Sequence, residues 1–192
     1  WLRETYPAIA ARAKAEGAAI YWADETAVKE DAHWIRGFAP AGRTPVLEMP
    51  ARWGKLSMIS AITNRGEISF QIVEGTINAE RFIEFLAHLL EDATAKVFLI
   101  VDNLRVHHAK IVRDWAEPLK DKIELFYLPP YAPESNPDEH LNHDFKTSLR
   151  LEPASDNDND LMQKAMRIMK RIAQIPGRVQ SYFQHPLAAY AA

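Results

Sequence analysis

Short apolar runs alternate along the chain with longer stretches in which apolar residues recur at helical spacing. The run 97–101 is entirely apolar, includes β-branched residues and is too short for a free-standing helix. Such a run predicts a strand that is covered on both faces. It ends at Asp102, and an earlier apolar run, 18–23, ends in the same way at Asp24. The pattern therefore predicts two buried strands that each close on an aspartate.

Further elements are predicted around these strands. Residues 56–63 and 67–74 flank the short turn Asn64-Arg65-Gly66, which predicts a β-hairpin. After Asn78, a helix-capping residue, apolar side chains recur every three or four positions and indicate a helix with one apolar face. The other predicted elements are a leading helix at 1–17, a helix at 104–115, a strand at 123–128, a helix opened by Asn136, and a C-terminal helix at 161–175.

This order of strands and helices predicts the fold class. Strand, hairpin, helix, strand, helix and strand in sequence favour an α/β sandwich built on a mixed sheet. We assign residues 1–175 to one domain, with a polar connection at 152–160, and expect 176–192 to form a loose tail. Ligands of open α/β sheets bind beyond the carboxyl ends of strands, so Asp24 and Asp102 are candidate site residues.

Composition narrows the class of protein. The 192 residues include no cysteine, which excludes disulfides and thiolate metal sites and favours a reducing cytoplasm. No apolar run approaches the roughly 20 residues of a membrane-spanning helix, and no secretory signal is visible. The formal net charge of −3 counts against nucleic-acid binding, because such domains usually have a basic excess. We therefore expect any basic recognition module to lie upstream of Trp1.

The helix after Asn136 carries a third acidic candidate, Glu139. An acid in the first turn also suits the helix dipole, so a capping role is the alternative to a functional one. The helical repeat places a set of polar residues on one side of this helix. They are Glu139, His143, Lys146 and Arg150. Such a stripe fits a surface that handles phosphates, and it also fits an ordinary solvated face.

Three carboxylates that meet would repel one another. If Asp24, Asp102 and Glu139 converge, each pair repels by about 4 kcal/mol at about 4 Å and an effective dielectric of about 20, so the cluster needs cations or protons. Oxygen ligands without cysteine select Mg²⁺ or Mn²⁺. Two such ions about 4 Å apart would activate water or a 3′-hydroxyl and stabilise the leaving oxygen of a phosphodiester. On this basis we expect Asp102→Asn to abolish Mg²⁺-dependent chemistry at this site and to stabilise the metal-free protein.

Several stretches together resemble a known family. They are Asp24, the run 101–108 (VDNLRVHH), the segment 36–40 (RGFAP) and, above all, the Pro-rich segment 128–142 (LPPYAPESNPDEHLN). These segments resemble the DDE transposases of the mariner-type superfamily, in particular its bacterial insertion-sequence branch. The sequence departs from many relatives at Asn142, where they have Trp.

The resemblance implies a ribonuclease-H-like fold, with a mixed five-stranded sheet flanked by helices on both faces. It implies that Asp24, Asp102 and Glu139 are catalytic and bind Mg²⁺, with Mn²⁺ as a substitute and two ions in the site. It further implies DNA cleavage at transposon ends and strand transfer into target DNA by a homodimer. An upstream helix-turn-helix region and a location in the bacterial cytoplasm, at the nucleoid, belong to the same expectation.

Candidate DNA contacts are the cationic and imidazole side chains near the three acids. His107 is expected either to orient Asp102 or to contact phosphate. The other candidates are Arg36, Arg43, Arg105, His143, Lys146 and Arg150. For any single arginine, a solvated surface position is the alternative.

Three other hypotheses fit parts of the pattern. A different ribonuclease-H-like nuclease or resolvase would hydrolyse DNA without joining strands. A non-catalytic, transposase-derived interaction module would bind partners without turnover. A zinc hydrolase would use His107, His108, His140 and His143, but the helical repeat turns His140 and His143 away from each other, which disfavours it.

Overall fold

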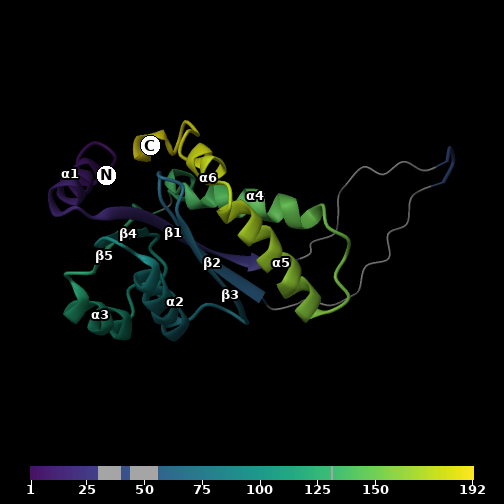
Figure 1. Ribbon diagram of the computed structural model, residues 1–192, viewed down its shortest axis with the longest axis horizontal. Helices are drawn as coiled ribbons and strands as arrows, with labels where there is room; N and C mark the ends of the chain where they lie inside the picture. The colour runs from purple at the N-terminus through teal and green to yellow at the C-terminus, as the bar shows by residue number, and fades with distance from the viewer. Residues whose placement is uncertain (30–39, 44–55, 131) are drawn as a thin grey trace.

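A five-stranded sheet forms the centre of the molecule, with helices on both faces (Figure 1). The computed structural model describes residues 1–29, 40–43, 56–130 and 132–192. The strands are β1 (Ala19–Val28), β2 (Leu56–Ile62), β3 (Ile68–Glu74), β4 (Val97–Val101) and β5 (Ile123–Tyr127). Their order across the sheet is β3-β2-β1-β4-β5. Strand β1 is antiparallel to β2 and parallel to β4, so the predicted mixed sheet is confirmed.

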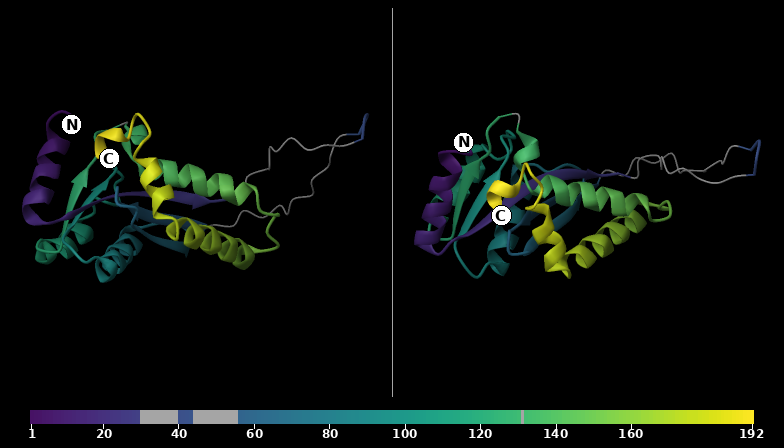
Figure 2. Two further views of the ribbon diagram at one scale, coloured as in Figure 1. Left: turned by 45° about the horizontal axis from the view of Figure 1, so that its top comes forward. Right: turned by 90° about the horizontal axis from the view of Figure 1, so that it is seen from above.

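Different helices cover the two faces of the sheet (Figures 1 and 2). One face carries α2 (Ala79–Asp92) and α3 (Lys110–Ala116), and the other carries α1 (Thr5–Glu16), α4 (Asp138–Arg150), α5 (Asp158–Ala173) and α6 (Pro176–Tyr182). Strand side chains alternate between two cores. Tyr21 and Leu99 face α2, whereas Trp22 and Ile100 face α4. Short 3₁₀ turns complete the chain: η1 (Glu117–Leu119), η2 (Pro133–Ser135) and η3 (Ala189–Ala191).

The strongest local patterns fold as predicted. Strands β2 and β3 form the expected hairpin around Asn64-Arg65-Gly66. Asn78 caps α2, since its side chain accepts a hydrogen bond from the Arg81 N–H at 2.9 Å. The apolar side of α4 is buried. These elements fix the sheet and the helix that carries Glu139.

Two predicted boundaries are wrong. Strand β1 continues past Asp24 to Val28, because β2 pairs with it as far as Val28 while β4 pairs only with residues 19–22. The helix predicted at 104–115 begins only at Lys110. Residues 104–109 instead form tight turns, in which the His107 N–H donates to the Leu104 carbonyl at 3.1 Å. This turn sets the direction of the His107 side chain.

The prediction of a loose tail at 176–192 is also wrong. Helix α6 begins at Pro176, and Val179 and Phe183 are buried in the same core as Trp22. The Phe183 ring meets the Trp22 ring edge-on, with 5.2 Å between centroids. In the sequence, Pro176-Gly177 indicates the end of a helix, but Pro is well tolerated in the first turn of a helix. The segment is therefore part of the folded core.

The hairpin turn makes a close contact with the start of α6. Gly66 has φ of +92°, and a Cβ placed there would lie 2.6 Å from the Pro176 carbonyl oxygen. Gly75 has a similar φ of +81° but no atom within 4 Å of such a Cβ. We expect Gly66→Ala to lower the free energy of unfolding by about 3 kcal/mol, through backbone strain and overpacking together. Gly75→Ala, which adds strain alone, is expected to cost about 1 kcal/mol.

Urea unfolding of both variants checks this prediction. Equal losses for Gly66→Ala and Gly75→Ala would mean that the contact with Pro176 has no energetic weight.

Candidate active site

Asp24 and Asp102 lie beside each other because of the parallel register between β1 and β4. Trp22 pairs with Ile100, so two residues further along each strand Asp24 comes level with Asp102. Strand β4 ends at Val101, which leaves Asp102 just beyond its carboxyl end. The two aspartates therefore stand where ligands bind in open α/β sheets.

Helix α4 brings Glu139 to the same place through contacts with β1. The Asn136 side chain donates to the Ala23 carbonyl at 3.0 Å, and the Asn142 side chain donates to Oδ2 of Asp24 at 2.8 Å. Glu139, which is half-buried, lies in the first turn between these two asparagines. The first turns of α4 are thus fastened to the strand that carries Asp24.

Burial and the neighbouring acids both act on Asp24. The side chain is half-buried, and this burial, followed by the charges of Glu139, Glu25 and Asp102, raises the pKa of Asp24 to about 8. Its neighbour Asp138 is fully buried and accepts a hydrogen bond from the Ser60 hydroxyl at 2.7 Å. Burial and the charge of Asp24 raise the pKa of Asp138 well above its ordinary value. The site holds more negative charge than it can keep ionised without a cation.

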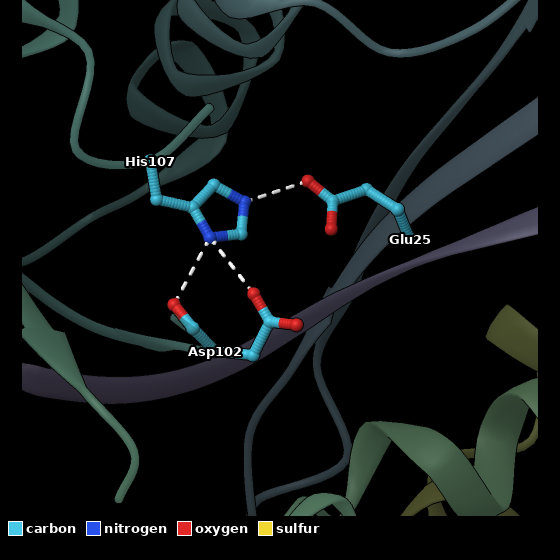
Figure 3. Close-up of side chains that lie close together, drawn as sticks. All are labelled: Glu25, Asp102 and His107. Atoms are coloured by element: carbon cyan, nitrogen blue, oxygen red, sulfur yellow. Dashed lines mark hydrogen bonds and ion pairs between the residues drawn. The ribbon is translucent and has the colours of Figure 1, made fainter. Parts of the chain in front are cut away.

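Asp102 is paired differently, with His107 (Figure 3). Nδ1 of His107 lies 3.1 Å from Oδ1 of Asp102, and Nε2 lies 2.7 Å from Oε1 of Glu25. Burial disfavours the charged imidazole, but the hydrogen bonds to Asp102 and Glu25 outweigh it and raise the pKa of His107 to about 10. His107 and the Leu104 N–H in turn outweigh the effect of burial on Asp102 and lower its pKa.

The group formed by Glu25, Asp102 and His107 is an ion triad and not a metal site. Their ligand atoms lie within 4.8 Å of one another. The imidazole, however, stands between the two carboxylates and uses one nitrogen for each, so the three groups do not point at a common centre (Figure 3). The imidazolium occupies the place that a cation would take. The second oxygen of Asp102 points away from the ring.

Among the residues that the structure describes, Asp24, Asp102 and Glu139 do not close into a group of ligand atoms within 4.8 Å. Carboxylates that repel one another are expected to stay apart until a cation joins them. The donor set nevertheless fits a hard divalent ion, because it consists of carboxylate oxygens, one of them on a half-buried side chain with a strongly raised pKa. These three residues would hold Mg²⁺ or Mn²⁺.

The predicted DNA contacts fall in several environments. Arg36 lies outside the described residues. Arg43 and Arg105 are exposed, as are His143 and Arg150 on α4, while Lys146 is half-buried. His107 is only 1% exposed, and both of its ring nitrogens are engaged. The alternative that His107 contacts phosphate is therefore wrong, and the alternative that it orients Asp102 fits the geometry.

Four site residues escaped the sequence prediction: Glu25, Ser60, Asp138 and Asn142. Strand alternation puts Glu25 on the face opposite Asp24, but nothing in the sequence indicates that His107 meets it there. Asn142 was visible as a departure from the family pattern. The zinc hypothesis gains no support, because His140 packs against His185, with 4.2 Å between ring centroids, and not against His107. In the described part of the chain, the histidines form no common metal-ligand cluster.

Comparisons with known proteins agree with this geometry. The model of the DDE superfamily endonuclease family matches residues 19–162. The structure is similar to the Mos1 mariner paired-end complex with Mn, with a TM-score of 0.66 and 15% identity, covering 100% of this chain and 62% of that one. It is also similar to the Mos1 transposase catalytic domain with Raltegravir and Mg, with a TM-score of 0.58 and 16% identity, covering 100% and 94%. A search of curated proteins found no match.

These similarities show the fold, which is the predicted ribonuclease-H-like one. The chain spans less than two thirds of the Mos1 chain in the paired-end complex. Within the described residues, no helix has the length and apolar character needed to cross a membrane. The family model covers most of the chain, including Asp24, Asp102 and Glu139. The chain therefore belongs to the DDE superfamily endonucleases.

Proposed function

We propose that this chain is the catalytic domain of a DNA transposase. It cleaves phosphodiester bonds at transposon ends and transfers the freed strands into target DNA, with Asp24, Asp102 and Glu139 as its catalytic and metal-binding residues. The observation that carries the proposal is the state of Asp24. Its carboxylate lies beside Asp102 and accepts a hydrogen bond from Asn142 of α4, and burial together with the neighbouring acids raises its pKa to about 8, which supports the binding of a cation there.

The cofactor that we propose is Mg²⁺, with Mn²⁺ as a substitute, bound as two ions. Carboxylate oxygens without thiolates favour these ions. When bound, they would activate the attacking hydroxyl or water and stabilise the leaving oxygen. His107 contributes by holding Asp102 through Oδ1, while the other carboxylate oxygen points away from the imidazole. Asn142 holds Asp24 in the same way from α4.

The partners that we propose are transposon-end and target DNA. The exposed candidates are Arg43, Arg105, His143 and Arg150, and Lys146 on α4 is half-buried. Several similar structures are complexes of Mos1, among them a paired-end complex with the left transposon end and a strand transfer complex. By extension, we propose a homodimer in the active complex and an upstream helix-turn-helix region.

We further propose that the protein belongs to the bacterial insertion-sequence branch and acts at the nucleoid in the cytoplasm. The catalytic domain that we propose comprises residues 1–175 together with the C-terminal segment, because α6 packs into the same core.

A strand-transfer assay tests the function. The chain, together with any sequence that precedes it in its parent protein, is supplied with a transposon end that carries a free 3′-hydroxyl, a target duplex and Mg²⁺. We expect joined products with the parent protein and none with Glu139→Gln. Cleavage without joining would identify a nuclease or resolvase on the same fold, and inactivity with both Mg²⁺ and Mn²⁺ would favour the non-catalytic module.

A further inference from the structure

The C-terminal segment contacts α4 and the turn before it at several points, although it lies beyond the region that the family model matches. We propose that residues 176–192 form a brace, here called the C-terminal brace, that sets the position of α4 and so of Glu139. This inference rests on the proposed function, because it takes Glu139 to be a metal ligand. Residues of the brace are positioning residues, since none of them reaches the three acids.

The main contact of the brace is with Asp144 on α4. Nε of Arg178 donates to Oδ2 of Asp144 at 2.7 Å, and Nη2 donates to Oδ1 at 2.6 Å. The Tyr182 hydroxyl donates to the same carboxylate. A bidentate pair fixes both distance and orientation. Asp144 lies little more than one helical turn beyond Glu139, so this contact holds the same part of α4.

A second contact holds the entrance to α4. The Tyr190 hydroxyl donates to the Ser135 carbonyl at 2.7 Å, and Ser135 ends η2, just before Asn136 and α4. The Tyr190 ring is itself fixed, because it packs edge-on against Tyr6 with 4.8 Å between centroids. The brace thus contacts α4 at Asp144, within the helix, and at Ser135, just before the helix begins.

The brace is anchored to the sheet by different residues. The Gln180 side chain donates to the Arg65 carbonyl at 3.0 Å, and the Asn64 side chain donates to the Ala191 carbonyl at 2.9 Å. Gly66 of the same turn touches Pro176, and Phe183 packs on Trp22 of β1. Contacts therefore run without a gap from the β2–β3 turn through the brace to α4.

Apolar packing alone would fix α4 less well. Leu141, Phe145 and Leu149 hold the helix to the core, but the hydrophobic effect has no preferred direction and opposes separation more than sliding or rotation. Asn136 and Asn142 fasten the first turns of α4 to β1, and the directional hydrogen bonds at Asp144 and Ser135 add to them in opposing such movements. A shift of α4 would carry Glu139 away from Asp24, and this links the brace to the metal site.

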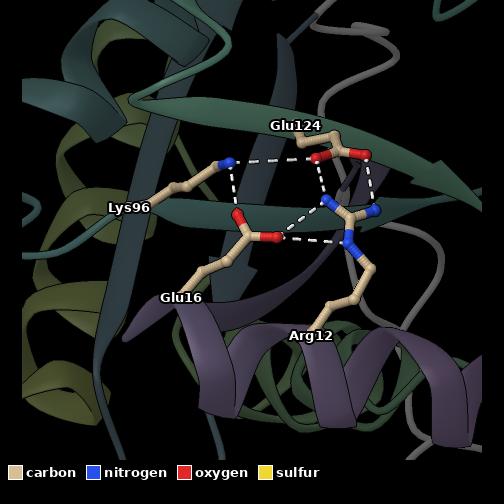
Figure 4. A network of polar contacts seen from close by, with 4 residues as sticks. All are labelled: Arg12, Glu16, Lys96 and Glu124. Carbon is tan, nitrogen blue, oxygen red and sulfur yellow. Dashed lines mark hydrogen bonds and ion pairs between the residues drawn. The ribbon is translucent and has the colours of Figure 1, made fainter.

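The chain offers a matched control at the opposite end of the parallel strands. Arg12 of α1 makes the same kind of bidentate pair with Glu124, at 2.9 Å and 2.7 Å (Figure 4). Glu16 and Lys96 complete this network with a contact of 2.6 Å. Glu124 stands near the amino end of β5, whereas Asp102 follows the carboxyl end of the parallel strand β4. Breaking the Arg12–Glu124 pair removes a similar interaction far from the site.

The experiment measures Mn²⁺ binding by titration calorimetry in the full chain, at a temperature where every variant is folded by circular dichroism. We expect Asp144→Asn to raise the Kd for Mn²⁺ about 10-fold and Tyr190→Phe about 3-fold, at the low end of the effects of residues that support metal ligands. Glu124→Gln should leave the Kd unchanged while lowering Tm as Asp144→Asn does. Arg178→Lys, which keeps the charge, should stay closer to the parent than Arg178→Met.

The outcomes separate the two proposals. If Glu139→Gln loses Mn²⁺ binding but Asp144→Asn and Tyr190→Phe bind like the parent, the brace proposal is wrong and the proposed function stands. If Glu139→Gln binds Mn²⁺ as the parent does, the proposed function fails and the brace proposal falls with it. Should Asp144→Asn not fold, Tyr190→Phe, which keeps the packed ring, decides the question.

Discussion

Replacing Asp24 by Asn is expected to abolish metal-dependent DNA cleavage and, at the same time, to stabilise the metal-free protein. The cleavage is lost because an amide cannot supply the charge of a metal ligand. The stability rises because Asp24 is the acid whose ionisation the fold opposes most clearly among the three, with a pKa of about 8. Asn at this position can still accept the hydrogen bond from Asn142.

The gain in stability of the metal-free Asp24→Asn variant should depend on pH. The folded pKa of Asp24 lies above its ordinary value of 3.8, so the folded protein binds this proton more tightly than the unfolded chain. The contribution of Asp24 to the free energy of unfolding therefore falls as the pH rises from about 4 to about 8. Urea unfolding in EDTA should show Asp24→Asn to be more stable than the parent by about 2 kcal/mol at pH 8, and by less at pH 5.

Asp102→Asn is the matched comparison, and its stability should change in the opposite direction. This corrects the expectation from sequence that removing the charge of Asp102 relieves repulsion. Asp102 has a lowered pKa because His107 and the Leu104 N–H stabilise its ionised form. The variant should also lose cleavage but should unfold more easily, by about 2 kcal/mol, since it weakens a hydrogen bond to a charged group. A gain in stability here would contradict the ion triad.

Replacing His107 by Ala is expected to have the second large effect. The change leaves the carboxylates of Glu25 and Asp102 facing an empty space, and removal of one partner from a buried charge cluster costs about 3 kcal/mol. Asp102 would also lose the contact that orients it. We expect cleavage at saturating Mg²⁺ to fall by about 10- to 100-fold, as for other residues that support metal ligands.

The neighbouring His108 provides the control for this variant. Its ring is exposed, stacks on Tyr127 with 4.1 Å between centroids and contacts Asn103. His108→Ala removes an imidazole from the same turn without touching the two acids. Chemical unfolding and cleavage rates should separate the two variants clearly. If both histidine variants behave alike, the imidazole of His107 does not support Asp102.

The elements that were predictable from sequence are those whose signal is local. The apolar run of β1, the Gly-containing turn of the hairpin and the cap at Asn78 each depend on a few neighbouring residues, and each predicted its element correctly. The end of β1 was not predictable in this way. It is decided by how far β2 continues to pair after β4 has ended, which is a property of the assembled sheet.

The same distinction applies to the site. The three acids could be named from sequence because each stands at a recognisable point of the family pattern. The partners that decide the protonation of these acids could not be named from sequence, since the contact of His107 with Glu25 joins positions 82 residues apart. The C-terminal segment was missed because its apolar residues acquire a partner only when Trp22 and Tyr6 are in place.

Asp24 and Glu25 are consecutive acids that face opposite sides of one strand. A deletion of a single codon between residues 19 and 23 that kept the pairing partners in place would turn each of them to the other face, because a one-residue slip reverses every side chain in a strand. Glu25 would then take the position that faces Asn142, Asp24 would take the buried position of Ala23, and Thr26 would face the imidazole. The register of β1 against its neighbours thus decides which acid enters the proposed site. Insertions or deletions in β1 should therefore abolish activity even where each substitution is tolerated.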